Sequence, residues 1–411
     1  MPAEQNAAAG APAAVAGGLA AAYRGLTVCD LSQGIAGPHA TMLLAQFGAN
    51  VIKVEPPAGD WGRGLGLRKG DHCAHSWQYN LGKSSLCVDL KNPDGREVLA
   101  ALASTSDIFV ESFRPGVAAR LGFGYDDVRK LRPDVIYASL SGFGQAGPNS
   151  GRGTVDALIQ GFSGMMVMNR TPDGVPHRQN MVAVDVMSGL YLFSAISAAI
   201  TRRIGTGEGC RLDISMMQSA AAFQAAKIAE HHLLQGKAAA FYGPVGFLPA
   251  IGGGLVVSCR LPAHFPVLCD ILGCPGLAAD VRFASAELRI ANGGELLNEL
   301  GEFSRAFPVA ALLNRLHEAA IPAERVYSYG EWLHDEHVNA TGAYQWVQAG
   351  ELGCLPRVRI PGLPVTHAGP APAIGEGGRG VLAALGYTPQ QIADLQQREA
   401  VRFDSGLSKS T

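Results

Sequence analysis

An aspartate at position 185 stands directly ahead of a long apolar segment, and its carboxylate could do two kinds of work. Apolar residues recur every three or four positions from Val186 to Ile200, which predicts a mostly buried helix over 185–204. As an N-cap, Asp185 would accept backbone N–H bonds at the start of that helix. As a nucleophile, it would be kept ionised at neutral pH by the helix dipole, beside N–H groups that stabilise oxyanions. The residues alone favour the cap.

Glycine-rich segments raise the alternative of a nucleotide-binding enzyme. Gly142–Gly147 matches G-x-G-x-x-G after a β-prone run, but Pro148 follows at once, where a dinucleotide fingerprint needs a helix. The loop at Gly34–Gly37 offers only G-x-x-G. Glu55, at the end of the second β-prone run, could bind a ribose but is more typical of a charge at a strand end. A nicotinamide-dependent oxidoreductase stays open as an alternative interpretation.

The elements that would position these residues alternate between β-prone and helical patterns. Strands are expected at 26–31, 49–54, 85–89, 107–110, 135–139 and 211–214, and helices at 38–47, 93–103, 125–131 and 216–234. This alternation predicts an α/β fold, a Rossmann-like, doubly wound parallel sheet.

After residue 243 the pattern changes to loops and shorter elements. The segments 255–258, 266–272, 294–306 and 310–320 predict a smaller α+β domain, and a proline-rich extended stretch at 355–372 precedes a last helix at 389–395. We therefore expect a large domain from residues 23–220 and 335–411, and a small domain at 221–334. Residues 1–22, rich in alanine and glycine, are expected to form a disordered tail.

Composition excludes several classes of protein. The 411 residues are 47% hydrophobic and 17% charged, which suits a large buried core. The net charge is -2 and no Lys/Arg-dense run occurs, so nucleic acid and anionic membranes are not expected partners. The apolar stretch at 190–200 is too short to cross a bilayer, and the first 22 residues lack the basic region of a signal peptide.

The eight cysteines are scattered along the chain, without C-x-x-C or the Cys/His spacing of a zinc site. We therefore expect reduced thiols, no bound metal and a cytoplasmic location.

Short motifs in a fixed order resemble a known family. They are Gly37–Ala45, Gly48–Pro57, Asn80–Lys91, Glu111–Gly116, Leu121–Gly122, Ser141–Gly144 and Gly205–Gly209. Taken together, from about residue 26 to 401, they are similar to the class III (CaiB/BaiF-type) CoA-transferases. The resemblance implies a Rossmann-like CoA-binding domain, an interlocked homodimer, and an enzyme that moves coenzyme A between small carboxylic acids.

The same resemblance reverses the interpretation of Asp185. In the family the nucleophile is an aspartate ahead of a helix and after a Pro-x-Arg-type segment, and Pro176–Arg178 followed by Val184–Gly189 matches this pattern. It implies that Asp185 attacks the donor thioester to give a mixed anhydride, which the CoA thiolate converts to an aspartyl-CoA thioester. The substrates are then an acyl-CoA, with succinyl-CoA as one candidate, and a small carboxylate. No permanently bound cofactor, metal or ATP is needed.

Carry-over from the family also implies a CoA site. Its residues would be Ile35, Ala36, Asn80, Lys83, Ser112, Phe113, Arg114, Arg120, Thr154, Val155 and Asp156. Cations and backbone N–H groups suit the pyrophosphate and 3'-phosphate of CoA, although each basic residue taken singly is also typical of a solvated surface charge. His39, His177 and Arg178 are further candidates that could bind the acceptor acid, with a loop histidine and a surface pair as the alternative interpretation.

Some positions depart from the family pattern. Pro56 and Ser84 stand where some members carry arginines, and Arg63 or Arg68 are the candidates to replace them. Related α-methylacyl-CoA racemases of the same fold use a histidine base where this chain has Val155, which argues against a racemase.

Two points stay open from the sequence. A non-catalytic CoA-binding relative would keep its function after Asp185→Asn. Either Gly243–Gly246 or Gly252–Gly254 could form a loop that shields the active site, although a hairpin turn is the simpler interpretation of the second.

Overall fold

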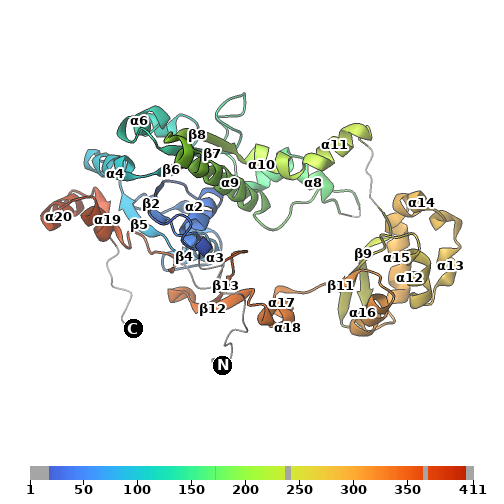
Figure 1. The fold of residues 1–411 in the computed structure, drawn as a ribbon. Helices are drawn as coiled ribbons and strands as arrows, with labels where there is room; N and C mark the ends of the chain where they lie inside the picture. Colours follow the sequence, from blue (N-terminus) through green and yellow to red (C-terminus); the bar gives the residue numbers. More distant parts are fainter. Residues whose placement is uncertain (1–17, 172, 237–241, 364–368, 404–411) are drawn as a thin grey trace. The chain divides into compact units, whose positions relative to one another are not determined.

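The computed structural model describes residues 18–171, 173–236, 242–363 and 369–403 (Figure 1). The chain forms two compact units, a large unit of residues 1–225 and 340–411 and a small unit of residues 226–339. The boundaries expected for the small domain, 221 and 334, each lie five residues before these limits. Residues 1–17 of the expected tail lie outside the described residues. The prediction of disorder is wrong for residues 18–22, which form a turn in which Ala22 N donates to Leu19 O at 3.0 Å.

A seven-stranded sheet organises the large unit, in the order β14-β5-β2-β1-β6-β7-β8. Its strands are β1 (Thr27–Asp30), β2 (Asn50–Glu55), β5 (Ser84–Val88), β6 (Ile108–Glu111), β7 (Ile136–Ser141), β8 (Cys210–Ser215) and β14 (Val401–Arg402). All neighbours pair in parallel except β14, which is antiparallel to β5. Numbered along the chain, the six parallel strands lie 3-2-1-4-5-6, and the order reverses between β1 and β6. In doubly wound sheets ligands bind at this switch point, beyond the carboxyl ends of the strands.

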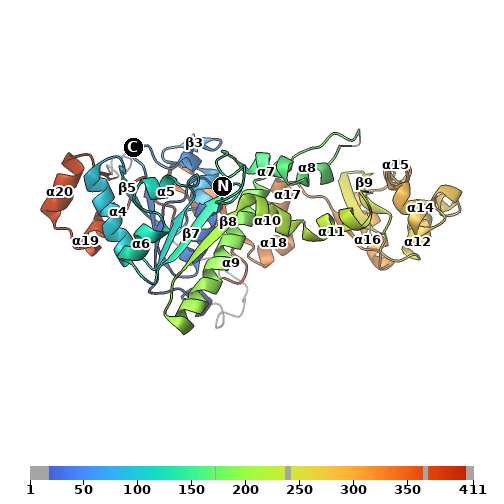
Figure 2. The same cartoon turned by 90° about the horizontal axis from the view of Figure 1, so that it is seen from above.

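Helices cover both faces of this sheet, so the large unit is a mixed α/β structure. Along β1, Val28 packs into the core formed with α2 (Ala36–Gln46) and α9 (Ala183–Thr206), which lie side by side (Figure 1). The next residue, Cys29, packs into the opposite core. The helices of that core are α4 (Pro93–Thr105), α6 (Tyr125–Leu131), α19 (Gly378–Ala384) and α20 (Pro389–Gln397), which Figure 2 shows from above. Successive strand residues therefore point to opposite helical layers.

Short elements complete the large unit around this sheet. They are η1 (Trp61–Gly64), β3 (Arg68–Lys69), β4 (His72–Cys73), α3 (Ala74–Gln78), α5 (Val117–Arg120), α7 (Asp156–Phe162), α8 (Met165–Met168), α10 (Met216–Phe223), β12 (Tyr344–Gln348), η3 (Gly350–Leu352) and β13 (Cys354–Val358). The stretch expected to be extended at 355–372 contains most of β13, and its residues 364–368 lie outside the described part.

The chain returns to the large unit at its end, after the small unit. Residues 369–403 bring back the edge strand β14, and Gly375 donates its backbone N–H to Ser85 Oγ at 2.8 Å. Pro372 O accepts a hydrogen bond from the Arg63 guanidinium at 3.1 Å. This returning segment therefore completes one edge of the sheet.

Two helix predictions are wrong in extent. The single helix expected at 216–234 is divided into α10 and α11 (Ala225–Leu233), and at the break the Gln224 side chain donates to the carbonyl oxygens of Ala220 and Ser163. Helix α9 has 24 residues and is longer than expected. It is the one described helix that, by length and composition alone, could cross a membrane, and its buried residues pack against α2 and the sheet.

The small unit combines a three-stranded antiparallel sheet with helices around its own core. Its strands are β9 (Val245–Ala250), β10 (Gly253–Ser258) and β11 (Ala323–Arg325), in the order β11-β10-β9. Its helices are α12 (His264–Leu272), α13 (Pro275–Ala278), η2 (Val281–Phe283), α14 (Ala286–Ala291), α15 (Gly293–Ser304), α16 (Val309–Glu318), α17 (Tyr329–His334) and, at the boundary, α18 (Glu336–Ala340). The hairpin expected at Gly252–Gly254 is confirmed, since Gly253 pairs with Ala250 and Gly252 has a φ of +82°.

Candidate active site

The loops after β1 and β6 meet where the strand order reverses. Leu31 N donates to Val110 O at 2.8 Å, and Gln33 N donates to Ser112 Oγ at 2.9 Å. The fold thus brings together three of the residues expected to bind CoA, Ile35, Ala36 and Ser112. Because the side chains of Ile35 and Ala36 are buried, these two residues can contact a ligand in the crevice only through their backbone.

The loops after β6 and β7 also pack closely together. A Cβ added at Gly153 would lie 2.6 Å from Arg114 Nη2, and one added at Gly142 would overlap Thr154 Cγ2. Arg114 and Arg120 are exposed, and neither forms an ion pair with a residue that the structure describes. Phe113 is half-buried, and its backbone N–H donates to Glu111 Oε2 at 2.8 Å. Two unpaired guanidinium groups therefore stand near the switch point, where phosphates could meet them.

Lys83 and Asn80 have a different position from the one expected. The Lys83 ammonium donates to Asp30 Oδ2 at 3.0 Å, Pro38 O at 2.9 Å and Asn80 Oδ1 at 2.9 Å. An ammonium has three hydrogens, so all three are used. Asn80 Nδ2 donates to Ser76 O at 2.8 Å, and both side chains are buried. Lys83 is thus a buried ion-pair partner, neither a surface charge nor an ammonium free for CoA.

The Lys83–Asp30 pair belongs to a larger buried network beneath the loop after β1. Lys53 pairs with Asp60 Oδ2 at 2.7 Å and donates to Ser32 O at 3.0 Å. Asp60 Oδ1 accepts the backbone N–H of Gly34 at 2.9 Å. Burial alone would raise the pKa of Asp30, but the charges of Lys83 and Lys53 hold it below its usual value. The network therefore stays charged and fixes the loop from below.

Arg63 and Glu55 form the other half of this network. Arg63 donates Nε to Glu55 Oε2 at 2.8 Å and Nη2 to Glu55 Oε1 at 2.7 Å, and Ser85 Oγ donates to the same carboxylate. Both residues are buried. Arg63 therefore cannot replace a family arginine toward a ligand, and Glu55 is neither a surface charge nor a ribose-binding acid. Arg68 is exposed and lies 3.5 Å from Asp71 Oδ1.

The N-terminus of α9 is capped by Asp156 and not by Asp185. Asp156, the first residue of α7, accepts the backbone N–H groups of Val184 at 2.7 Å and Asp185 at 3.0 Å on its Oδ2 atom. Its other oxygen is bonded to Gln160 Nε2 at 2.5 Å. Asp185 is the third residue of the helix, so the cap interpretation of Asp185 is wrong. Asp156, expected to contact CoA, instead fixes the first turn that carries Asp185.

The environment of Asp185 favours its protonated form. Burial, and secondly the neighbouring Asp156 carboxylate, raise the pKa of Asp185 from 3.8 to about 7. The expectation that the helix dipole keeps this carboxylate fully ionised at neutral pH is therefore wrong, because desolvation and like charge outweigh the dipole. No basic side chain in the described part of the chain forms an ion pair with Asp185.

His39 lies beside the first turn of α9, and Tyr79 lies beside His39. His39 Nδ1 lies 3.1 Å from Val186 O, and its ring centroid lies 5.2 Å from that of Tyr79. Burial lowers the pKa of His39 to about 4, so the ring is neutral and Nδ1–H donates to the carbonyl. Burial and then the charge of Asp185 raise the pKa of the Tyr79 phenol. Tyr79 was not predicted as a site residue, and the only hint of it was an aromatic residue just before Asn80.

Glycine 189 allows α2 and α9 to pack closely at this point. A Cβ added at Gly189 would lie 2.7 Å from both Ala36 O and His39 Nδ1. A larger residue here would push α2, and the loop that precedes it, away from Asp185.

Four of the remaining candidates lie at exposed or partly exposed positions. His177 and Arg178 are exposed, in agreement with the surface interpretation, and His177 N donates to Asn169 O at 2.9 Å. Val155 is half-exposed and Thr154 is partly buried. Gly142–Gly147 is followed by residues without helical structure until α7 begins at Asp156, so the context that a dinucleotide fingerprint requires is missing.

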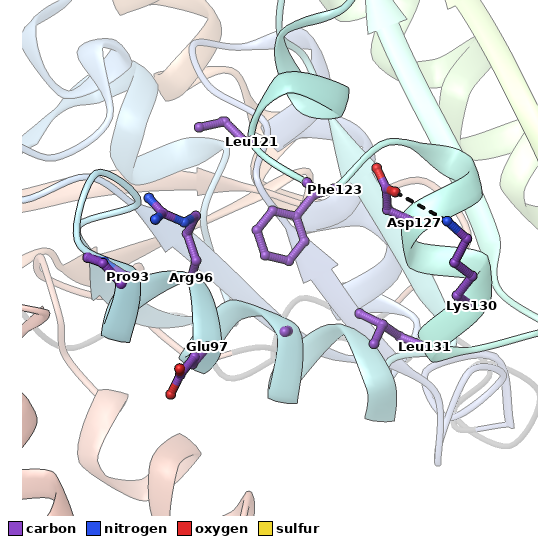
Figure 3. A pocket seen from close by; sticks show the side chains of 10 residues that line it. Pro93, Arg96, Glu97, Leu121, Phe123, Asp127, Lys130 and Leu131 are labelled. Carbon is purple, nitrogen blue, oxygen red and sulfur yellow. Dashed lines mark ion pairs between the residues drawn. The ribbon is translucent and has the colours of Figure 1, made fainter.

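Two cavities lie in the large unit, and the candidate residue Thr154 lines the smaller of them. One of about 380 Å³ is lined by Phe143, Arg152, Gly153, Thr154, Ala157, Leu158, Gly161, Phe162 and Met166. Another of about 510 Å³ lies between α4 and α6, where Phe123 points between Arg96 and the Asp127–Lys130 ion pair (Figure 3). None of the candidate site residues lines the larger cavity.

Comparison with known proteins gives consistent matches over most of the chain. A family model described as CoA-transferase family III matches residues 23–377. The acetyl-CoA:oxalate CoA-transferase of Acetobacter aceti is 36% identical over 313 residues, covering 73% of this chain and 79% of the relative. The succinate–glutarate CoA-transferase of Agrobacterium fabrum is 32% identical over 383 residues, covering 88% and 95%. A crystal structure of a CAIB/BAIF family protein from Brucella suis matches with a TM-score of 0.77 and 28% identity, over 88% of this chain and 98% of that one.

Proposed function

Because the chain belongs to CoA-transferase family III, we propose that it moves CoA from an acyl-CoA donor to a small carboxylic acid through covalent intermediates on Asp185. The observation that carries this proposal is a carboxylate held on the first turn of α9, without a cationic partner among the described residues and with a pKa raised to about 7. The relatives named for oxalate and for succinate and glutarate support short mono- or dicarboxylates as the acids exchanged.

The proposed reaction begins when Asp185 attacks the thioester carbonyl of the donor. The carbon–sulfur bond breaks, CoA leaves as the thiolate, and an aspartyl mixed anhydride forms. The thiolate then attacks the aspartyl carbonyl and displaces the donor acid as its carboxylate, leaving an aspartyl-CoA thioester. The acceptor carboxylate repeats both steps in reverse and restores the free Asp185 carboxylate.

The position of the Asp185 carboxylate near the Asp156 carboxylate favours these steps. A partly buried carboxylate that lacks a counter-ion is less well solvated than a surface carboxylate and therefore more reactive when ionised. Acylation or thioesterification of Asp185 removes its negative charge, which relieves the repulsion by Asp156. At the same time, the hydrogen bonds from Val184 and Asp185 N–H groups to Asp156 hold the helix turn in place. Asp156 is therefore a positioning residue in this proposal.

The proposed CoA site lies at the switch point of a Rossmann-like large domain. Backbone groups of Ile35 and Ala36 and the side chain of Ser112 border the crevice, and Arg114 and Arg120 are the cations proposed to meet the phosphates. Asn80 and Lys83 contribute indirectly, because their buried hydrogen bonds fix the loop after β1. An interlocked homodimer, implied by the resemblance to the family, and a cytoplasmic location, expected from the reduced cysteines, are parts of the same proposal.

The proposal is tested by product analysis with wild-type protein and Asp185→Asn. Succinyl-CoA is incubated with a panel of acids that includes oxalate and glutarate, and new acyl-CoA thioesters are identified by mass spectrometry. Wild-type protein should form at least one new thioester, and the variant none, while calorimetry should find similar CoA affinity for both. Hydroxylamine added during turnover should convert Asp185, and no other residue, to a hydroxamate. Transfer at full rate by the variant would contradict the proposal.

A second measurement distinguishes a CoA-transferase from a racemase. A racemase would exchange the α-hydrogen of a 2-methylacyl-CoA with deuterium from solvent. Because Val155 stands at the position of the histidine base, we expect no Asp185-dependent exchange of the α-hydrogen with deuterium.

A further inference from the structure

Trp61 is a large aromatic side chain left half-exposed at the switch point. It begins η1, in the loop after β2, and its side chain is 53% exposed. The six-membered ring of its indole lies against Gly34, in the loop after β1, so closely that a Cβ at Gly34 would overlap it. Gly34 has a φ of +81°, which independently favours glycine there.

The indole is held in this place by the buried network. Asp60 caps η1 by accepting Gly62 N at 2.8 Å and also accepts Gly34 N at 2.9 Å, which ties the two loops together. Cys73 Sγ donates to Gly62 O at 3.2 Å and joins η1 to the β3–β4 hairpin. An exposed aromatic ring on such a rigid support is pre-organised for contact with a ligand.

The acid at the end of β2 is not available to a ligand. In doubly wound sheets this loop faces the adenosine half of a dinucleotide, commonly through an acid at the end of the second strand. Here that acid, Glu55, is buried and doubly bonded to Arg63, and Pro56 follows it. Leu67 and Arg68 are also exposed in this segment, and the one aromatic side chain that it exposes is the indole of Trp61.

We propose that Trp61 stacks on the adenine ring of CoA, beside a strand end whose acid, Glu55, is already bonded to Arg63. Adenine is the one aromatic ring of CoA, and stacking on an indole face needs no particular hydrogen-bonding pattern. This assignment rests on the proposed use of CoA as substrate, and it concerns affinity for the adenosine half, not the chemistry at Asp185.

The test measures binding rather than turnover, so its outcome is separate from that of the proposed reaction. Calorimetry of Trp61→Ala should show CoA affinity reduced roughly 5- to 100-fold, since base stacking contributes ~1–3 kcal/mol and 1.4 kcal/mol is tenfold. Trp61→Phe should keep most of the affinity. A phosphopantetheine thioester, which lacks adenosine, should bind wild-type protein and both variants equally.

A matched control is available in the same unit. Trp346, in β12, is 51% exposed, and Trp346→Ala should leave CoA affinity unchanged. In addition, adenosine 3',5'-bisphosphate should quench the tryptophan emission of wild-type protein and of Trp346→Ala, but not of Trp61→Phe. The proposal is overturned if the bisphosphate leaves wild-type emission unchanged, or if Trp61→Ala weakens the phosphopantetheine thioester as much as CoA. If the protein transferred no CoA but the bisphosphate still quenched the Trp61 emission, the result would contradict the role of Asp185 and not the role of Trp61.

Discussion

Two clusters of charged residues in the large unit are built in opposite ways. Beneath the loop after β1, three acids, Asp30, Glu55 and Asp60, are matched by three bases, Lys53, Arg63 and Lys83. At the start of α9, Asp156 and Asp185 stand together without a basic partner among the described residues. The pKa of Asp30 is held low in the first cluster, and that of Asp185 is raised in the second.

The difference separates charges that support the fold from charges available for chemistry. A buried ion pair with all its hydrogen bonds made has no capacity left for a ligand. A buried carboxylate beside another carboxylate gains stability when it loses its charge, by protonation or by acylation. Burial of a charged residue is therefore no guide to function until its partners are known.

Removal of Lys83 should have the largest effect on folding. In Lys83→Met, Asp30 would be left as an unpaired buried charge, and the free energy of unfolding should fall by about 3–5 kcal/mol, as measured by chemical denaturation. The matched control is Lys130→Met, which removes an exposed Lys130–Asp127 pair and should change stability by less than about 1 kcal/mol. A folded Lys83→Met protein of normal stability with weak CoA binding would instead restore Lys83 as a ligand contact.

Removal of the Asp185 charge should stabilise the protein at neutral pH. Because the folded-state pKa of Asp185 is raised from 3.8 to about 7, the stability that protonated Asp185 provides is lost as pH rises through 7. Asp185→Asn should therefore be more stable than wild type at about pH 8, on the order of 2 kcal/mol, and equal to it near pH 4.

Thermal denaturation as a function of pH checks the Asp185 prediction. The exposed Asp126→Asn serves as the control and should not show a difference that grows between these two pH values. A destabilised Asp185→Asn at alkaline pH would mean that an unrecognised cation pairs with the carboxylate.

Substitutions at two glycines of α9 test the close contact between α2 and α9. A methyl group at Gly189 would press on Ala36 O and His39 Nδ1, so Gly189→Ala should lower the free energy of unfolding by about 1–2 kcal/mol and slow transfer. At Gly205, in the same helix, a Cβ meets nothing within 4 Å. Gly205→Ala should therefore be neutral or stabilising by up to ~1 kcal/mol. Equal effects of the two substitutions on denaturation and turnover would show that the close approach is unimportant.

The smallest expected effect concerns Asp156. Asp156→Asn keeps an oxygen that can accept the Val184 and Asp185 N–H groups but removes a negative charge. The pKa of Asp185 should fall, and the rise of the transfer rate with pH should move to lower pH. The shift should be only part of the total elevation, since burial is the larger cause. An unchanged pH–rate profile at normal stability would remove Asp156 from the electrostatics of the site.

Most of the fold followed from the sequence because local patterns decide it. The expected helices at 93–103 and 125–131 agree with α4 and α6, where a proline at N1 and acidic residues in the first turn mark the start. Asp185 and the switch-point loops were found through family motifs. The strand order itself agrees with the doubly wound sheet that the alternation predicts.

The partners of the charged residues could not be predicted, because they come from distant segments. Lys83 meets Asp30, 53 positions earlier, and Asp185 meets Asp156, 29 positions earlier. One signal was missed: Lys53 stands inside the apolar strand Val51–Val54, and a lysine in a buried parallel strand requires an acid nearby. The break between α10 and α11 was not predicted, and one contact made there, from the Gln224 side chain to Ser163 O, comes from a distant segment.

The return of residues 369–403 to the large unit has a consequence for biosynthesis. Arg63 cannot bond to Pro372, 309 positions later, and β5 cannot pair with β14 before these later residues have been synthesised, so this edge of the sheet closes only after residue 402 has left the ribosome. The small unit, residues 226–339, is fully translated earlier. Since domains fold as their residues emerge, the small unit can complete its core before the large unit, which needs residues on both sides of the insertion.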